Sequence, residues 1–386
     1  MDSDGREVNI FENFPECMLF EVLLRLPVKV LFRFMTVSKQ WFSMISHRYF
    51  ARTYAALSSP HSQPCWGIVK EVLSHHCWHR KDCEMHRVVF PSDKVLEDFD
   101  GTLLGFSNGL ALYGEHWDKV HRIYVCRIRN LITGELITLP QYEGCPKHLS
   151  AGFVTQVEDN VLVSCRVVLI DYSGTDFRVR RFAVYFSETC KWVDFDIDFG
   201  QEIFFISENK PVVVGKILHQ RIYGHRLLAY DPYNKPDSFR LISLPGVERR
   251  MYTYLFNEHQ GYLRYLMVAF DEREDEYGSL IIWDLRYYNR GEWCLQHRVG
   301  LGRIQPDGGG LTTSMRPLCF HPFDSGILYM VNDHVIFSYD IRTQTWKILY
   351  DANKYSRCGF IYMSPWHTFV IPPWPTCTRN FSRNCF

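Results

Sequence analysis

FPECMLFEVLLRLPVKVLFRFMTVSKQWFSMI, the stretch from Phe14 to Ile45, decides how this chain begins to fold. Between Glu16 and Ile45, 19 of 30 residues are apolar, which is far more than the single apolar stripe of an ordinary surface helix. The part from Cys17 to Leu26 is apolar nearly all round and is interrupted only by Glu21 and Arg25. We therefore expect this stretch to be covered on more than one face.

Prolines divide the stretch into helical pieces. Pro15 suits the first turn of a helix, where its missing amide hydrogen costs nothing. Pro27 ends that helix, because the residue before a proline is pushed out of the α region. A second amphipathic piece follows from Val28 to Val37, and Ser38 can cap a third. The pattern predicts three helices between residues 10 and 50, a unit too small to bury so many apolar residues by itself.

The same residues carry a resemblance to a known motif. Phe14-Pro15-Glu16, Arg25-Leu26-Pro27-Val28 and Val37-Ser38-Lys39-Gln40-Trp41 resemble the F-box in its plant form. The resemblance implies a docking element for a small Skp-type adaptor, which links F-box proteins to cullin and RING subunits of a ubiquitin ligase. The alternative is a helical cap on a larger domain. Residues at the adaptor-contact positions of the motif, or supporting them, are Phe14, Pro15, Leu19, Val22, Leu23, Leu26, Pro27, Val28, Leu31, Phe34, Val37 and Trp41.

Composition limits the remaining possibilities. The 386 residues are 46% hydrophobic, and 43 basic residues balance 43 acidic ones, so the chain lacks the positive surface that binds nucleic acid. No run approaches the eighteen apolar residues of a membrane span, and the polar N-terminus is unlike a signal peptide. We expect a cytoplasmic or nuclear protein whose 13 cysteines are free. Ser-Pro-rich sequence predicts a linker over residues 51–64.

After the linker, short β-type runs replace the helical pattern and repeat. Each unit has an apolar strand, a polar turn and an aromatic or leucine that opens another strand, and these anchors are Leu136, Trp192, Phe239, Trp293 and Trp346. Their spacing of 47 to 56 residues is the length of a kelch-type, four-stranded propeller blade. We expect six blades, with seven or eight as alternatives, between residues 65 and 376. Each anchor should pack against the next blade, and strands from both ends of the chain should close the ring. Residues 377–386 would form a tail.

Two turns in this region resemble the F-box-associated domain of plant F-box proteins. The first is Leu104-Gly105-Phe106-Ser107-Asn108-Gly109-Leu110, and the second runs from Asn130 through Thr133-Gly134 to Leu136. The predicted architecture is thus a small all-α N-terminal F-box followed by a large all-β domain, a β-propeller.

One cluster has residue types that bind metals. Cys77, His79, Cys83 and His86 lie close together, but their spacing matches no familiar pairing of zinc ligands, and a solvated loop is the preferred interpretation. We expect no metal, no cofactor and no catalytic residues.

The favoured hypothesis is a non-catalytic substrate-recognition subunit of an SCF-type ubiquitin ligase, with its target bound by the β domain at unknown residues. One alternative is a binding module that uses the adaptor without promoting degradation. Another is a propeller enzyme acting on a small ligand.

Overall fold

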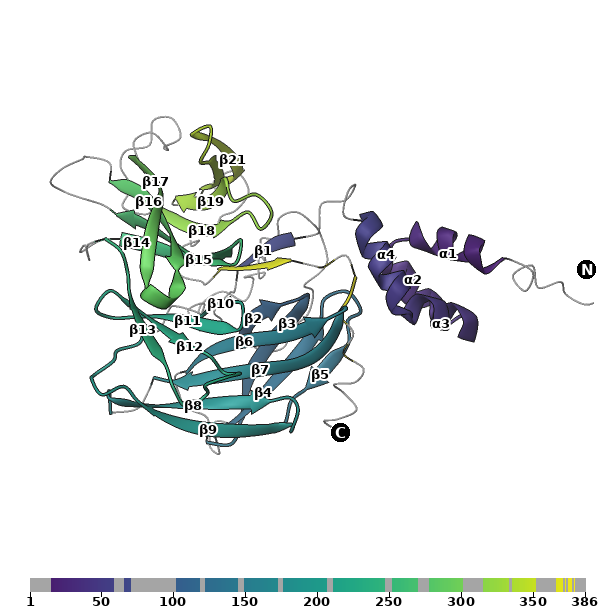
Figure 1. The fold of residues 1–386 in the computed structure, drawn as a ribbon, viewed down its shortest axis with the longest axis horizontal. Coiled ribbons are helices and arrows are strands. Elements are labelled where there is room, and N and C mark those ends of the chain that lie inside the picture. Colours follow the sequence, from purple (N-terminus) through teal and green to yellow (C-terminus); the bar gives the residue numbers. More distant parts are fainter. Residues whose placement is uncertain are drawn as a thin grey trace, which may run out of the picture.

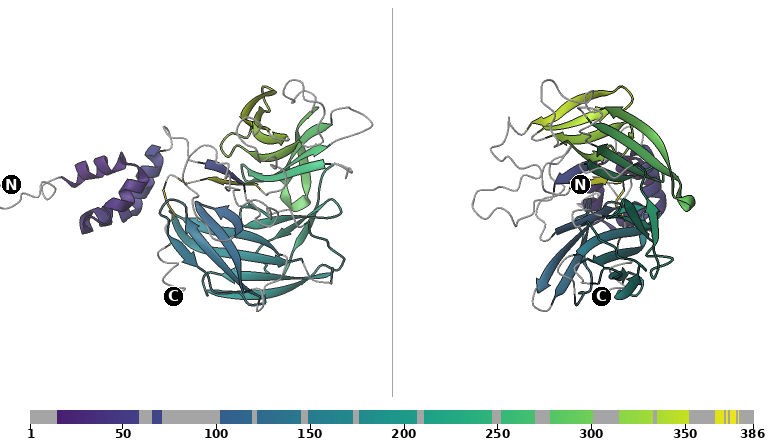
Figure 2. Two further views of the ribbon diagram at one scale, coloured as in Figure 1. Left: turned by 180° about the vertical axis from the view of Figure 1, so that it is seen from behind. Right: turned by 90° about the vertical axis from the view of Figure 1, so that its left-hand side faces the viewer.

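The structure is a computed structural model of the chain. It describes residues 15–58, 66–70, 102–118, 122–144, 149–172, 176–206, 211–246, 252–269, 278–300, 315–332, 335–351, 366–370, 372, 374–376 and 378. A group of helices, the helical module, stands to one side of a larger body of β-sheets (Figures 1 and 2).

Four helices make up the helical module: α1 (Glu16–Leu24), α2 (Val28–Phe34), α3 (Lys39–Ser46) and α4 (Arg48–Ser58). Pro15 and Pro27 are the N-cap residues of α1 and α2. At the start of α3, the Ser38 hydroxyl oxygen accepts a hydrogen bond from the Trp41 backbone amide at 3.2 Å. Pro15 and Pro27 thus flank the first helix as expected, and Ser38 caps α3 as expected.

The fourth helix differs from the expectation of three helices followed by a linker from residue 51. Helix α4 continues to Ser58, and its side chains Phe50, Ala51 and Tyr54 are buried among the other helices. These three positions lie on one face of a helix, because residues three and four apart are neighbours on its surface. The polar and charged residues between them hid this apolar stripe from the sequence pattern.

Five four-stranded antiparallel sheets, here numbered as blades 1 to 5 along the chain, form most of the β body. Blade 1 contains β2 (Thr102–Ser107), β3 (Leu110–Asp118), β4 (Ile123–Asn130) and β5 (Leu136–Thr138). Blade 2 contains β6 (Leu149–Glu158), β7 (Val161–Asp171), β8 (Val179–Phe186) and β9 (Lys191–Asp198). Blade 3 contains β10 (Val212–Val214), β11 (Ile217–Ile222), β12 (Arg226–Tyr230) and β13 (Arg240–Ser243). Blade 4 contains β14 (Tyr252–His259), β15 (Tyr262–Ala269), β16 (Ser279–Tyr287) and β17 (Glu292–Gly300). Blade 5 contains β18 (Arg316–Phe320), β19 (Ile327–Asn332), β20 (Val335–Asp340) and β21 (Thr345–Asp351).

The blades form a closed ring through their first strands. Strand β6 lies beside β2 and β10, and β14 lies beside β10 and β18. The ring is completed by a two-stranded sheet of β1 (Trp66–Lys70) and β22 (Trp366–Val370), because β22 lies beside both β18 and β2. The expectation that strands from both ends of the chain close the ring is confirmed by this pairing.

The expected number of six blades is wrong, since the described residues form five. The sixth unit was expected one repeat before Leu136, with a strand at residues 86–90, and these residues lie outside the described part of the chain. Strand β1 pairs with β22 from the other end of the chain and not with a neighbour in sequence. A repeat period measured along the chain cannot reveal a sheet that is assembled from both ends.

The antiparallel order of strands gives the propeller two faces. Turns after the first and third strands of each blade lie on one face, which we name the helix-side face because α4 contacts it. Turns after the second strand, and the connections between blades, lie on the opposite face, the far face. Asn108–Gly109 and Asp159–Asn160 are first turns and so belong to the helix-side face.

Hydrophobic clusters fill the spaces between neighbouring blades. One cluster joins blades 1 and 2, a second joins blades 2 and 3, a third joins blades 3 and 4, and a fourth joins blades 4 and 5. Tyr185, Tyr230, Tyr265 and Tyr339 are among the largest fully buried side chains, and each belongs to one of these clusters. Packing is therefore local, from each blade to the next.

The described cysteines include free thiols and one disulfide-bonded residue. Within the described residues Cys17, Cys126, Cys165, Cys294 and Cys319 are free. Burial raises the pKa of the Cys165 and Cys319 thiols, so both stay protonated. Cys190 takes part in a disulfide, which the expectation of free cysteines did not include.

Candidate interaction surfaces

The helical module exposes large apolar side chains on α1 and near the start of α3, and we name Met18, Val22, Val37 and Phe42 the exposed apolar end. Met18 and Val22, one turn apart on α1, are 56% and 48% exposed, and Val37 and Phe42 beside the start of α3 are 62% and 38% exposed. A hydrogen bond from Gln40 Nε2 to Glu16 Oε1 (3.4 Å) holds the beginnings of α3 and α1 together. Single exposed apolar residues are normal, whereas a group of them on so small a module marks a surface that contacts another protein.

The residues expected at the adaptor contact fall into three groups. Pro15, Val22, Pro27 and Val37 are exposed, and Leu26, Val28, Phe34 and Trp41 are half-buried. Leu19, Leu23 and Leu31 are buried in the core of the helical module, with Leu23 and Leu31 fully inaccessible, so they support the helices from inside. Phe14 lies outside the described residues.

The blade anchors lie on the outermost strands or just before them. Trp192 Nε1 donates to Pro140 O of blade 1 at 2.8 Å, and Trp293 Nε1 donates to Ser243 O of blade 3 at 2.9 Å. Phe239 packs its ring 4.6 Å from that of Phe199, which follows blade 2. These three anchors thus contact the preceding blade, although the next blade was expected. Trp346 borders the cluster between blades 4 and 5, whereas Leu136 is 55% exposed.

Three buried arginines connect blades in a way that the sequence reading missed. Each lies on the second strand of its blade and places its guanidinium over an aromatic ring of the following blade: Arg166 over Tyr233 at 4.3 Å, Arg221 over Tyr254 at 4.2 Å and Arg264 over Phe320 at 5.3 Å. A cation over an aromatic face is attracted by the ring quadrupole, more strongly when water is excluded. The signal in the sequence that could have revealed these arginines is a charged residue inside an apolar strand, such as Arg166 in VLVSCRVVLI.

Exposed aromatic side chains gather on the far face at blades 2 and 3. Phe177, Phe204 and Tyr223 are 38%, 43% and 57% exposed. The rings of Phe177 and Phe204 lie 4.7 Å apart, and Phe204 O accepts a hydrogen bond from Tyr223 N at 2.9 Å. Beneath them the buried guanidinium of Arg180 lies 5.0 Å from the Phe177 ring. We name these three residues the far-face aromatic cluster.

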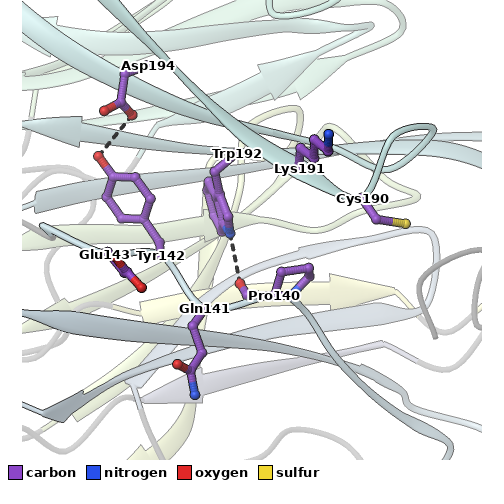
Figure 3. A pocket seen from close by; sticks show the side chains of 8 residues that line it. All are labelled: Pro140, Gln141, Tyr142, Glu143, Cys190, Lys191, Trp192 and Asp194. Atoms are coloured by element: carbon purple, nitrogen blue, oxygen red, sulfur yellow. Dashed lines mark hydrogen bonds between the residues drawn. The ribbon is translucent and has the colours of Figure 1, made fainter.

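A shallow, open pocket of about 460 Å³ lies between blades 1 and 2 (Figure 3). Two hydrogen bonds cross it: Tyr142 Oη donates to Asp194 Oδ1 at 3.0 Å, and the Trp192 indole donates to Pro140 O at 2.8 Å. The ring of Trp192 packs 5.2 Å from that of Tyr142. These contacts join blades 1 and 2.

The described part of the chain shows neither a metal site nor a membrane-spanning helix. Among the residues that the structure describes, no three or more His, Cys, Asp or Glu side chains converge to hold a metal ion. The cluster of Cys77, His79, Cys83 and His86 lies outside that part of the chain. Within the same part, every helix is too short or too polar to cross a membrane.

A packed helical module with an exposed apolar end, followed by a propeller, is the architecture of an F-box protein with a β-propeller. The F-box domain model matches residues 11–53. A model described as "F-box protein At3g26010-like, beta-propeller" matches residues 58–368. That match covers most of the chain, which belongs to the F-box protein At3g26010-like β-propeller family.

Relatives in Arabidopsis thaliana agree with this assignment. "Putative F-box protein At3g23970" is 25% identical over 381 residues, which cover 90% of this chain and 88% of that protein. "F-box protein At3g26010" is 26% identical over 349 residues, covering 85% and 77%. Among solved structures, a chain of "Crystal Structure of Mitotic Checkpoint Complex" has a TM-score of 0.34 at 12% identity, covering 67% of each chain. The more specific kelch type stays a prediction.

Proposed function

We propose that this chain is the substrate-recognition subunit of an SCF-type ubiquitin ligase. In this proposal the helical module binds a Skp-type adaptor, and through it cullin and RING subunits, while the propeller binds a target protein. The chain itself would be non-catalytic and would work in the cytoplasm or nucleus. Residues 10–58 would then be the adaptor-binding unit, and most of the remaining chain the target-binding unit.

The observation that carries the proposal is the exposed apolar end of the helical module. Met18, Val22, Val37 and Phe42 leave water only if another protein covers them, and they lie in the F-box that the family match identifies. Glu21 and Arg25 on the same helix form an exposed ion pair (3.5 Å) that can stay at the rim of such an interface.

The mechanism would be proximity. Holding a target and a ubiquitin-charged enzyme in one complex replaces a bimolecular encounter by an effectively intramolecular one, which raises the local concentration of target lysines. The required property of the receptor is thus two separate binding surfaces. The far-face aromatic cluster suits the second, because it lies on the opposite face from the helical module and exposes three rings.

The experiment compares tagged full-length variants in plant cells by affinity purification and quantitative mass spectrometry. Val22→Asp should remove the Skp-type adaptor, cullin and RING subunits while retaining proteins held by the propeller. A double variant, Phe204→Ser with Tyr223→Ser, should do the opposite. Leu57→Asp is the matched control, since Leu57 on α4 is 53% exposed but lies outside the expected contact.

The outcomes separate the candidate functions. Proteins that the double variant loses should accumulate in cells carrying Val22→Asp if binding leads to degradation. If the adaptor binds but these proteins keep their normal turnover, the chain is a binding module and not a degradation receptor. A wild-type purification without any Skp-type adaptor would contradict the proposal.

A further inference from the structure

A tryptophan from the C-terminal end of the chain lies in the core of the helical module. Trp374 is 7% exposed, and its ring lies 5.3 Å from Tyr54 and 5.6 Å from Phe50, both on α4. It also lies 5.6 Å from Phe32 on α2. Tyr54 in turn donates from Oη to Leu26 O at 2.9 Å, between α1 and α2. A residue more than 300 positions away in sequence thus contributes to the core of the F-box.

The residues around Trp374 are fastened to blade 1. Thr376 Oγ1 donates to Asn108 O at 2.6 Å, and Asn130 Nδ2 donates to Thr376 O at 2.9 Å. Thr378 Oγ1 donates to Glu135 Oε2 at 2.5 Å. We name Pro372, Trp374–Thr376 and Thr378 the C-terminal strap. Its described residues are buried or half-buried, so it is a packed element.

The C-terminal strap packs against two turns of blade 1, one at Gly109 and one at Asn130. Packing between blades alone does not explain why these residues stand there. Gly109 has φ of +74°, and a Cβ there would lie 2.5 Å from Pro372 Cδ, so only glycine lets the strap approach so closely. Asn130 is 2% exposed, and its Oδ1 accepts hydrogen bonds from Ile132 N and Thr133 N at 2.9 and 3.1 Å. The side-chain nitrogen of Asn130, Nδ2, donates to Thr376 O of the strap. Both residues belong to the turns that resemble the F-box-associated domain.

A second contact joins the same parts. Asp159, in the first turn of blade 2, forms ion pairs with Arg48 and Arg52 of α4, including a hydrogen bond from Arg52 Nε at 3.0 Å. The hydrogen bond from Arg52 is the main cause that holds the pKa of Asp159 below its usual value, so the carboxylate is charged at neutral pH. These groups are largely exposed, and we expect them to contribute less than the buried strap.

We propose that the C-terminal strap completes the F-box and fixes it to the propeller, with Trp374 as a positioning residue for adaptor binding. Trp374 does not belong to the exposed apolar end, because it is buried against α2 and α4. Its effect on the adaptor is indirect. Without its ring, α2 and α4 lose a shared buried contact, and a smaller fraction of molecules presents Val22 and Val37 in a binding-competent arrangement.

The test measures amide hydrogen exchange and adaptor affinity on the full-length chain. Trp374→Ala should raise exchange in α2 and α4 by about tenfold or more while blades 3 to 5 stay unchanged, because local stability controls local opening. It should weaken adaptor binding by about tenfold, as the competent fraction falls. Trp374→Phe should restore most of both values. Tyr287→Ala, which removes an exposed aromatic side chain of blade 4, is the matched control and should change neither value.

A milder variant covers the case in which Trp374→Ala unfolds the module. Thr376→Val removes only the hydroxyl that donates to Asn108 O, and it should raise exchange in α4 while circular dichroism keeps its helical signal. The adaptor measurement rests on the proposed function, but the exchange measurement does not. If the wild-type chain fails to bind an adaptor, the proposed function is wrong. The exchange measurement still tests whether the strap stabilises α2 and α4. Exchange in α2 and α4 within twofold of wild type in both variants would overturn the inference.

Discussion

Arg264 and Asp284 form a buried, two-pronged ion pair between neighbouring strands of blade 4. Arg264 Nε lies 2.7 Å from Asp284 Oδ1, and Nη2 lies 3.1 Å from Oδ2. Asp284 is fully buried and Arg264 is 6% exposed. The same guanidinium lies over Phe320 and donates to Ser325 O at 3.5 Å, so the pair also connects blade 4 with blade 5.

Removing one partner of this pair should be costly. Asp284→Ala leaves the Arg264 charge buried without a counter-ion, and we expect the free energy of unfolding to fall by about 3–5 kcal/mol. Chemical denaturation of the purified chain measures this change. Asp196→Ala is the control, because both partners of its ion pair with Arg181 (3.4 Å) are exposed, and losing such a pair should matter little. Equal losses for the two variants would show that burial does not set the cost.

Trp293 should stabilise the junction between blades 3 and 4. Its indole donates to Ser243 O, and its ring lies 6.0 Å from Tyr265. Because Trp293 is only half-buried, Trp293→Ala should cost about 2 kcal/mol, less than truncation of a fully buried tryptophan. Trp293→Phe keeps an aromatic ring but loses the hydrogen bond, so its stability should lie between those of the wild type and Trp293→Ala. A melting temperature unchanged in Trp293→Ala would contradict a structural role for this anchor.

His219 should make the propeller sensitive to mild acid. Burial lowers the pKa of His219 to about 4, and its Nε2 lies 2.8 Å from Tyr288 Oη of the next blade. The unfolded chain binds this proton below about pH 6.5, whereas the folded chain binds it only near pH 4. The stability from neutral His219 is therefore complete above about pH 6.5 and falls as the pH drops toward 4, by up to about 3 kcal/mol.

His219→Gln provides the comparison, since glutamine carries no titrating proton in this range. Urea midpoints measured from pH 7.5 to 4.5 should fall less steeply in His219→Gln than in the wild-type chain. Parallel slopes for the two proteins would mean that His219 is not the group responsible. Burial lowers the pKa of His297 and His321 as well, so some acid sensitivity should remain in the variant.

Local features of the fold could be predicted from the sequence because they depend on neighbours along the chain. Pro15, Pro27 and Ser38 stand at helix starts as expected, and the anchor spacing revealed a propeller. The closure by β1 and β22 was also expected, but not the blade number, which depends on how two chain ends share one sheet.

Contacts between distant segments could not be read from the sequence. Trp374 was assigned to the propeller because it follows β-type sequence, yet it packs against Phe50 and Tyr54. Leu23 was expected at the adaptor contact or supporting it, and the sequence did not distinguish these two roles, whereas its complete burial places it in the core of the helical module. Apolar periodicity identifies a residue that leaves water but does not tell which partner covers it.

The exposure of each residue decides whether its substitution tests adaptor docking or only the stability of the helical module. Leu23→Ala would create a cavity in the helical module and could abolish binding by unfolding it. Val22 and Val37 are exposed, so an aspartate there should leave the fold intact while placing a charge in the interface. Circular dichroism and melting temperature should therefore match the wild type in both variants.

The most direct measurement is calorimetric titration of the purified full-length chain with a purified Skp-type adaptor. We expect saturable binding by the wild type and by Leu57→Asp. We expect binding about a hundredfold weaker for Val22→Asp combined with Val37→Asp, because truncating or charging a central contact typically costs about 2 kcal/mol or more. Absence of binding by the wild type, or equal affinity in the double variant, would contradict the assignment of the helical module as an adaptor-docking surface.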